Sequence, residues 1–398
     1  MKKRILYISQ SVFPLNAPGI RVQRIADEFI KCGFQVTFFN TAKYNSSISI
    51  TSQLSGISEY YEDKSKFHFT INDSEYHCRK TQNHNNAING LLDMLFAYDT
   101  YKYATELCFK YKPYAIVLYN DYGPLTYRLL PFCKKYGIKI FADVTEWYEN
   151  KTNIKSISDI LIPRMVDYRI RHIDKGLNGV ISISQYLHHH YTSIGVKSVC
   201  IPPLMPIDKS YQPRVTNSTP LLVYAGSPGE KDLLAPAINA VLAINAGSVR
   251  LNFLIIGINN EYIESEYGIK EFEKQGIHAL GRITHEKVIE ILRESDFSFL
   301  FRRKLRYAKA GFSTKLAESL SMGVPVICNS IGGSDTVIID NYNGFVLNSC
   351  QIQDISNCLH YISNMSINER QKMKDNAFKS STLFEGSNYD SLLKELIN

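Results

Sequence analysis

Short apolar runs alternate along the chain with longer stretches whose apolar residues recur at helical spacing. The first apolar run, Ile5–Ser9, has the length of a buried strand. The stretch from Arg21 to Lys31 then carries apolar residues at positions 22, 25, 29 and 30, a spacing that predicts a helix with one buried face. A further strand at Gln35–Phe39 completes a β/α/β unit at the start of the chain.

The same alternation continues through both halves of the chain. In the first half we predict further strands at Phe67–Ile71, Ala115–Tyr119, Ile138–Ala142, Gly179–Ser184 and Ser198–Ile201, with helices at 87–110, 124–136, 160–177 and 185–193. In the second half we predict strands at Leu221–Ala225, Leu251–Ile256, Phe297–Phe301, Val324–Ile327 and Gly344–Leu347, with helices at 233–244 and 286–295. Residues 42–66 have weak periodicity and are interpreted as a variable loop region with a small helix. The pattern predicts an α/β protein with two Rossmann-like, doubly wound domains.

A proline-rich segment from Pro202 to Pro213 separates the two halves. A chain of 398 residues exceeds one ordinary hydrophobic core, so two domains are expected. We place the N-terminal domain at 1–205, a linker at 206–218 and the C-terminal domain at 219–380. The remaining segment, 381–398, contains an amphipathic helix that we expect to pack back toward the N-terminal domain.

The most informative stretch is Gly311–Ile327, which reads as a loop, a short helix, a tight turn and a buried strand. Ser313 or Thr314 can cap the helix, whose first backbone N–H groups then point at the loop. Lys315 lies in the first turn, where a cation opposes the helix dipole unless an anion binds there. Glu318 follows one turn later on the same face. Free amides, a lysine and a carboxylate suit a nucleotide diphosphate; a surface Lys–Glu pair is the alternative.

Two further segments are expected at the carboxyl ends of strands, where doubly wound folds bind their ligands. The first, Tyr224–Asp232, contains Gly226 and Gly229, which let the backbone approach a ligand, and Lys231, a second cation. The second begins at Arg302 and continues with the basic residues Arg303, Lys304, Arg306 and Lys309. A plain turn and a solvated basic loop are the alternatives.

In the first half, Asp143 and Glu146 follow the predicted strand Ile138–Ala142 and lie beside Trp147, the only tryptophan. Sugars stack on aromatic faces and hydrogen-bond to carboxylates, so this segment is a candidate platform for an acceptor. Asp143 could instead cap a following helix.

Composition narrows the function without defining it. The net charge of +7 suits an anionic substrate or an acidic membrane surface, and the basic residues form no nucleic-acid stripe. The eight cysteines contain no C-x-x-C pair, which favours reduced thiols over disulfides or zinc. No signal-peptide pattern or membrane-spanning run is visible, so we expect a cytoplasmic protein or one that is peripheral on the inner face of a membrane.

Several other chemistries lack their sequence signatures. The dinucleotide fingerprint G-x-G-x-x-G is missing after the first strand, which disfavours a nicotinamide dehydrogenase. A serine hydrolase would need a G-x-S-x-G elbow. His188, His189 and His190 are adjacent, and adjacent residues of a helix point in different directions, so we predict no metal site there.

These residues resemble retaining glycosyltransferases of the GT-B fold, the bacterial group that builds surface polysaccharides and glycolipids. The resemblance covers nearly the whole chain. It is carried by Lys315, Glu318 and Gly323–Ile327, followed by Gly332-Gly333 and Asn343-Gly344, with further matches at the Gly19 turn, at 179–184 and at 226–231. It implies two Rossmann-like domains that face each other across a cleft.

The resemblance also implies roles for individual residues. The C-terminal domain would hold a nucleotide-diphosphate sugar as co-substrate, with no cofactor, and the N-terminal domain would hold the acceptor. Lys231 would contact the diphosphate and Glu318 the ribose, and both are taken as catalytic together with Asp143. The implied donor-binding residues are Gly19, Gly226, Ser227, Lys231, Arg302, Gly311, Phe312, Ser313, Thr314, Lys315 and Glu318.

Two departures from the family pattern leave alternatives open. Ala310 stands where the family usually carries a second glutamate, and Asp143 to Glu146 stand where it often carries a histidine. We therefore predict sugar transfer to a hydroxyl of a glycan or lipid-linked acceptor, with retention and without metal. An inverting enzyme that uses Asp143 or Glu146 as general base is one alternative. A non-catalytic donor-binding partner of a glycan synthesis complex is the other.

Overall fold

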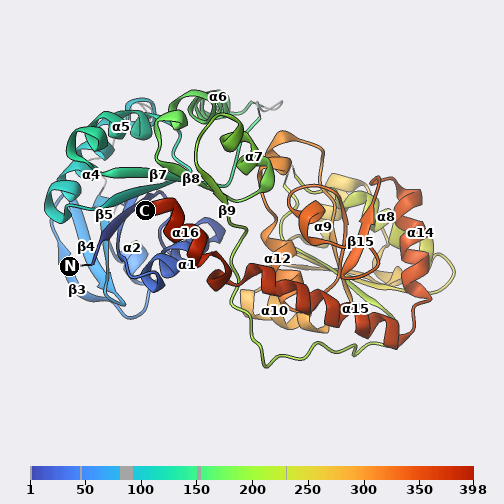
Figure 1. The fold of residues 1–398 in the computed structure, drawn as a ribbon. Helices are drawn as coiled ribbons and strands as arrows, with labels where there is room; N and C mark the ends of the chain where they lie inside the picture. Colours follow the sequence, from blue (N-terminus) through green and yellow to red (C-terminus); the bar gives the residue numbers. More distant parts are fainter. Residues whose placement is uncertain (1, 45–46, 81–92, 150–153, 230) are drawn as a thin grey trace. The chain divides into compact units, whose positions relative to one another are not determined.

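The structure is a computed structural model that describes residues 2–44, 47–80, 93–149, 154–229 and 231–398 (Figure 1). The chain divides into two compact units. The first comprises Met1–Leu204 and Gly386–Asn398, and the second comprises Met205–Glu385. The predicted fold class is confirmed, since each unit is an α/β layer structure built around a largely parallel sheet.

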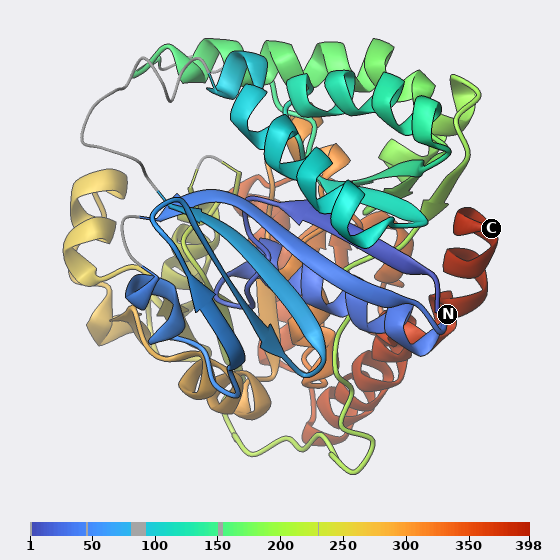
Figure 2. The ribbon, with the colours of Figure 1, turned by 90° about the vertical axis from the view of Figure 1, so that its left-hand side faces the viewer.

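The first unit is built on a nine-stranded sheet with the order β3-β4-β5-β2-β1-β6-β7-β8-β9. Its strands are β1 Arg4–Ser9, β2 Gln35–Tyr44, β3 Ser58–Glu62, β4 Lys66–Ile71, β5 Ser74–Lys80, β6 Ala115–Tyr119, β7 Lys139–Val144, β8 Gly179–Ser182 and β9 Ser198–Cys200. Its helices include α1 Ala17–Lys31, α2 Ile48–Thr51, α4 Tyr98–Tyr111, α5 Pro124–Tyr136, α6 Ser158–Tyr168 and α7 Gln185–Ser193. Figure 2 shows α4 and α5 side by side over one face of this sheet. Part of the helix predicted at 87–110 lies outside the described residues.

The region interpreted as a variable loop contains more regular structure than predicted. Strand β2 extends to Tyr44, and β3 pairs antiparallel with β4, which in turn pairs antiparallel with β5. Every residue of β3 is exposed, so it lacks the alternation that reveals a strand. The β4–β5 turn is formed by Asn72 and Asp73, both with positive φ. An Asn-Asp pair at this place favours a tight hairpin turn, and the sequence prediction did not include it.

The second unit is built on a six-stranded parallel sheet with the order β12-β11-β10-β13-β14-β15. Its strands are β10 Leu221–Ala225, β11 Asn252–Ile256, β12 Ile277–Gly281, β13 Phe297–Leu300, β14 Val326–Asn329 and β15 Gly344–Leu347. Its helices are α8 Ala235–Asn245, α9 Asn260–Tyr267, α10 His285–Glu294, α11 Arg306–Ala310, α12 Thr314–Ser321, α13 Ser334–Val337, α14 Ile352–Ser363 and α15 Ile367–Ser380. Its main core packs apolar residues of β10, β11 and β13 against α8 and α14.

The last helix, α16 (Asp390–Ile397), belongs to the first unit although it follows the whole second unit in sequence. Leu393, Leu396 and Ile397 are buried in the core of the first unit, against α1, β8 and β9. Gly179 allows this contact, because a Cβ at that position would lie 2.6 Å from Leu396 Cδ1. The chain therefore crosses between the units twice.

Candidate donor site

The strand order of the second unit defines one place where a ligand is expected. Strand β10 lies beside β13, and the chain winds outward from this pair in both directions, toward β12 on one side and β15 on the other. In doubly wound sheets, ligands bind outside the carboxyl ends of the strands at this switch point. Residues 226–229 and 231–232 follow β10, and Arg302 follows β13, so the described parts of both predicted basic segments begin there.

Asp232 is the residue around which the polar groups of this edge gather. Its Oδ2 accepts hydrogen bonds from Lys315 Nζ at 2.5 Å and from the Tyr224 hydroxyl at 2.8 Å. Arg302 Nε lies 3.3 Å from Asp232 Oδ1, and the two residues also form an isolated backbone bridge. Asp232, Tyr224 and Arg302 are buried, so these charges are held away from water. Two cations share one carboxylate, which leaves this cluster with a positive charge.

Lys315 lies in the first turn of α12, as predicted, but an anion of the protein already faces it. Its ammonium is bound to Asp232 and lies 4.5 Å from the centre of the Tyr224 ring. Burial lowers the pKa of Lys315, and the Asp232 carboxylate opposes that shift. Gly226 makes room for the side chain, since a Cβ there would lie 2.4 Å from Lys315 Cε. The φ of Gly226 is +133°, which any other residue would adopt only with strain.

Lys231 immediately precedes Asp232 and is half-buried. Its Nζ lies 3.6 Å from the centre of the Tyr307 ring, a cation–π contact with a side chain of α11. Its carbonyl oxygen accepts a hydrogen bond from the Arg303 N–H at 3.0 Å, which links the loop after β10 to the loop after β13. Ser227, on the same loop, is exposed.

The amino end of α12 has no side-chain cap. Ser313 occupies the capping position, and its N–H donates to the Gly332 carbonyl at 3.2 Å. The Ser313 hydroxyl is buried and makes no hydrogen bond to a described residue. The expectation that Ser313 or Thr314 caps the helix is therefore not met. The N–H groups of the first turn are left without a capping oxygen, which is the condition for binding an anion.

The remaining predicted residues of this stretch surround the same helix. Gly311 is buried, and the half-buried ring of Phe312 packs on Gly333 and edge-on to Phe384. Thr314 is half-buried. Glu318 is half-buried one turn after Lys315, and its negative charge raises the pKa of that lysine. The loops after β10 and β13 and the start of α12 thus bring together the predicted residues of the second unit.

Four residues singled out in the sequence as candidate site residues belong to the first unit, namely Gly19, Asp143, Glu146 and Trp147. Gly19 lies in the first turn of α1, and its N–H donates to the capping Asn16 side chain at 2.9 Å. A Cβ at Gly19 would lie 1.6 Å from the Phe13 carbonyl oxygen, so close packing accounts for this glycine. A donor contact for Gly19 stays a prediction.

Asp143, at the end of β7, is fully buried in the first unit. Arg21 binds both of its carboxylate oxygens, at 2.8 and 3.0 Å for Oδ1 and 3.2 Å for Oδ2, and the Tyr7 hydroxyl donates to Oδ2 at 2.7 Å. Burial, followed by the negative charge of Asp143, raises the pKa of Tyr7 well above its usual value. This network gives Asp143 a structural role, and its burial argues against the predicted acceptor contact or general base.

The acceptor platform predicted around Trp147 also needs correction. Trp147 is buried, its Nε1 donates to Asp167 at 2.8 Å, and its ring packs on His190 at 4.5 Å and near Arg171 at 5.0 Å. A ring covered in this way offers no open face to a sugar. Glu146 is half-buried and accepts a hydrogen bond from the Tyr148 hydroxyl. A role for Glu146 stays a prediction.

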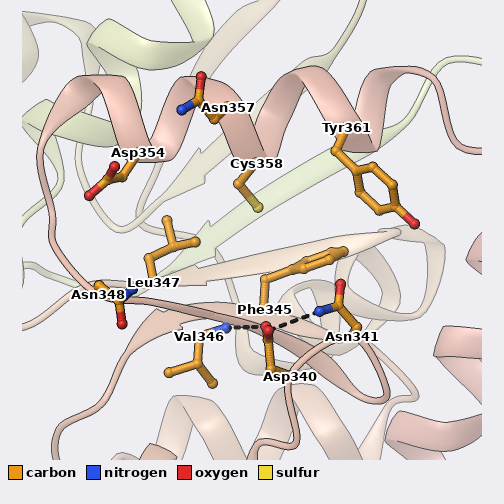
Figure 3. A pocket seen from close by; sticks show the side chains of 10 residues that line it. All are labelled: Asp340, Asn341, Phe345, Val346, Leu347, Asn348, Asp354, Asn357, Cys358 and Tyr361. Atoms are coloured by element: carbon orange, nitrogen blue, oxygen red, sulfur yellow. Dashed lines mark hydrogen bonds between the residues drawn. The ribbon is translucent and has the colours of Figure 1, made fainter.

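Two of the cavities in the described part of the chain are relevant to a site, and both lie apart from the residues that were predicted. One, of about 330 Å³, lies at the carboxyl ends of β1, β2 and β6, which is the switch point of the first sheet. The other, also of about 330 Å³, lies between β15 and α14 of the second unit (Figure 3). In this second cavity both oxygens of the Asp340 carboxylate already accept hydrogen bonds within the protein, from the Val346 N–H and from the Asn341 amide, both at 2.9 Å.

Sequence reasoning missed the partners that connect the site. The sequence prediction gave Asp232 and Tyr224 no role in the site, since Asp232 was noted only as the residue after Lys231 and Tyr224 only as part of a strand. A carboxylate within a basic loop, at the expected end of a strand, was an available signal for Asp232. Arg21 gave no such signal, because its partner Asp143 lies 122 positions away in the sequence.

No group of three or more metal-ligating side chains occurs within the described residues. No helix in the described part of the chain is long and apolar enough to cross a membrane.

The fold is that of GT-B glycosyltransferases. The whole chain is similar to sucrose-phosphate synthase from Thermosynechococcus elongatus, with a TM-score of 0.72 at 13% identity over 99% of this chain and 98% of that one. It is similar also to the catalytic domain of starch synthase IV from Arabidopsis thaliana, solved with ADP and acarbose, with a TM-score of 0.69 at 12% identity over 100% of this chain and 99% of that one. For HepE from Anabaena, solved with UDP and glucose, the TM-score is 0.61 at 13% identity over 99% and 98%.

The sequence comparison points to the same class through the second unit. Residues 215–380 match the family described as Glycosyl transferases group 1. Two uncharacterized glycosyltransferases of Methanocaldococcus jannaschii are 24% identical over 106 residues and 26% identical over 137 residues. These alignments cover 27% and 34% of this chain, and 26% and 37% of those relatives. The family match contains the cluster formed by Tyr224, Asp232, Arg302 and Lys315 together with helix α12.

Proposed function

We propose that this protein is a glycosyltransferase that moves a sugar from a nucleotide-diphosphate donor to a hydroxyl of a glycan or lipid-linked acceptor. The observation that carries the proposal is the positive cluster at the switch point of the second sheet, beside the uncapped start of α12. A pyrophosphate needs cations and free N–H groups together, and this place supplies both. The family match over residues 215–380 covers the same segment.

In sugar transfer, the second unit would have to stabilise the leaving group. As the bond between sugar and phosphate breaks, negative charge grows on the departing nucleoside diphosphate. Lys231, Lys315 and Arg302 would hold that charge together with the N–H groups of α12, and no metal is then needed. Each charge-assisted contact would contribute about 1.5–3 kcal/mol. Asp232 keeps Lys315 and Arg302 in position before the donor arrives.

Glu318 would bind the hydroxyls of the nucleoside ribose, since it lies one helical turn beyond the phosphate-binding end of α12. We propose retention of configuration at the transferred carbon, with the departing phosphate taking the proton of the acceptor hydroxyl. The burial of Asp143 and its pairing with Arg21 support this over an inverting reaction that uses Asp143 as base. Determination of the product anomer by NMR separates the two reactions, and the inverted anomer would exclude retention.

The acceptor site would lie in the first unit, at the cavity beside the ends of β1 and β6. Its walls combine apolar side chains with Asn120, Thr41 and Ser9, a mixture that suits a polyhydroxylated group. We propose a role in surface polysaccharide synthesis, with the enzyme at the inner face of the membrane that carries its acceptor.

The experiment begins with a panel of sugar nucleotides, scored by thermal stabilisation, because a ligand of the native state raises the melting temperature. With the best donor, turnover is then compared between wild type and the variants Lys231→Ala and Glu318→Ala. Both should lose turnover at least about a hundredfold, the effect of removing roughly 2.7 kcal/mol from the transition state. Lys287→Ala is the control, since Lys287 is exposed on α10 and pairs only with Glu290 among its ionic neighbours within the described residues.

Near-wild-type turnover in both site variants would contradict the proposed roles. Stabilisation by a donor without turnover, for any acceptor tried, would instead favour the non-catalytic alternative.

A further inference from the structure

Helices α4 and α5 of the first unit expose large aromatic side chains where a solvated face is expected to be polar. Tyr127 is 68% exposed, Tyr98 62% and Phe109 55%, and Tyr136 is about half exposed. Phe96, which immediately precedes α4 in the chain, is also about half exposed. The buried sides of these helices are already filled by other residues, among them Leu107 on α4 and Leu129 on α5. The exposed rings are therefore not required for the core.

Ring–ring and cation–π contacts join α4 to α5 along this face. Phe109 of α4 contacts Phe132 and Tyr136 of α5, with ring centres 5.7 and 5.3 Å apart. Arg128 of α5 lies 5.8 Å from the ring of Tyr98 and 6.0 Å from the ring of Tyr101, both on α4. The two helices also lie side by side in Figure 2. We call this surface the aromatic–basic face.

The charge of this surface is strongly one-sided. Helix α5 contains no acidic residue, and the two helices with the capping Lys112 carry six basic and two acidic residues, a net charge of +4. The basic residues are Lys102, Lys110, Lys112, Arg128, Lys134 and Lys135, of which all but Arg128 are exposed. That charge is more than half of the +7 of the whole chain. Basic residues in the last turns complement the helix dipoles, but the dipoles do not explain the exposed rings.

Exposed aromatic rings interleaved with lysines are the composition of a surface that lies at a membrane interface. Tyrosine and phenylalanine rings insert at the level of the head groups, and each nearby lysine or arginine is attracted to anionic lipids. A protein partner of matching shape would not require the excess of lysine, because lysine is depleted in protein interfaces. Charge complementarity therefore selects an anionic membrane as the occupant.

We propose that the aromatic–basic face binds the surface of a membrane that contains anionic lipids, with α4 and α5 lying flat on the head groups. The inference rests on the membrane part of the proposed function and not on sugar transfer. The aromatic–basic face would keep the protein at the membrane that carries lipid-linked acceptors, although no described helix can cross that membrane.

The test uses the full chain and sedimentation with vesicles of phosphatidylcholine alone or with about a third of phosphatidylglycerol. Wild type should bind the anionic vesicles, release them as salt is raised, and bind neutral vesicles at least tenfold more weakly. One variant combines Phe96→Ser, Tyr98→Ser and Tyr127→Ser. A second combines Lys102→Gln, Lys110→Gln, Lys134→Gln and Lys135→Gln. Each should bind anionic vesicles at least tenfold more weakly than wild type.

The control variant combines Tyr361→Ser on α14 with Lys372→Gln on α15, an exposed ring and an exposed lysine of the second unit. It should bind vesicles as wild type does. Equal thermal stabilisation of all variants by the best sugar nucleotide verifies folding and keeps this test separate from donor binding. Wild type that stays in the supernatant with anionic vesicles overturns the proposal. So does unchanged binding by the two face variants, since another surface would then hold the membrane.

Discussion

Asp232 determines the chemistry of the donor site at the scale of the residue. Without it, the ammonium of Lys315 and the guanidinium of Arg302 would be two like charges held at a buried edge of the sheet. With it, each has a partner, and the Tyr224 hydroxyl completes the network. The site is therefore pre-organised, since its cations are held in place before a ligand binds.

The first prediction concerns this carboxylate. Asp232→Asn keeps the shape of the side chain but leaves Lys315 and Arg302 without a counter-charge. Removal of one partner from a buried ion pair costs about 3–5 kcal/mol, and the partial exposure of Lys315 places the expected loss of unfolding free energy at the lower end. Urea denaturation measures it. Glu290→Gln breaks the exposed pair with Lys287 and should cost less than about 1 kcal/mol. Equal effects of the two substitutions would contradict this account of the site.

The second prediction concerns Lys374 on α15, which is fully buried and donates to the Ser295 carbonyl. Burial lowers the pKa of Lys374 from 10.5 to about 8, although the Asp296 carboxylate opposes the shift. Between these two values the unfolded chain binds more protons than the folded one, so the lysine's contribution to stability rises with pH in this window and is constant below it.

Relative to Lys374→Met, the wild type should therefore gain unfolding free energy from pH 8 to about 10.5, by an amount on the order of 3 kcal/mol. Denaturant titrations across this range measure the difference. Lys372→Met, on the exposed side of the same helix, should follow the wild-type pH profile. A pH-independent difference between wild type and Lys374→Met would contradict the lowered pKa.

At the scale of the element, local signals in the sequence were enough to place α12 and β14. The run from Ser313 to Ile327 contains a helix start, a glycine stop and an apolar strand within one short stretch, and each depends only on neighbouring residues. The residues that turn this stretch into a site are not local. Lys315 is hydrogen-bonded to Asp232, 83 positions away in the sequence, and to Tyr224, 91 positions away. Hydrophobic periodicity does not predict contacts between residues so far apart. The edge strand β3 was missed because all its residues are exposed.

The third prediction concerns α16, the helix that returns to the first unit. Leu393 is fully buried in the core of that unit, whereas the adjacent Leu392 is 37% exposed. Leu393→Ala should lower the unfolding free energy by about 2–5 kcal/mol, through lost burial and the cavity left behind. Leu392→Ala is the matched control and should change it by less than about 1 kcal/mol. Similar losses from both substitutions would mean that α16 is not docked as described.

At the scale of the whole molecule, the alternating pattern was enough to predict two doubly wound units, because each apolar run and each amphipathic helix contributes to the same layered arrangement. The strand order adds the position of the site, since it identifies β10 and β13 as the switch point of the second sheet. The acceptor side was harder to predict. The sequence suggested that Asp143 and Trp147 form an acceptor platform. Both are buried in the structure, Asp143 beneath Arg21 and Tyr7 and Trp147 against His190.

The central claim is that this switch point binds a nucleoside diphosphate through Lys315 and its neighbours. Isothermal titration of UDP, ADP and GDP into wild type, Lys315→Met and Lys287→Met tests it without any knowledge of sugar or acceptor. We predict that at least one of the three nucleotides saturates a single site on wild type and on Lys287→Met with equal Kd. Lys315→Met should bind that nucleotide at least about tenfold more weakly, a loss of roughly 1.4 kcal/mol. Binding by Lys315→Met as tight as that of wild type, or no binding of any of the three to wild type, would contradict the claim.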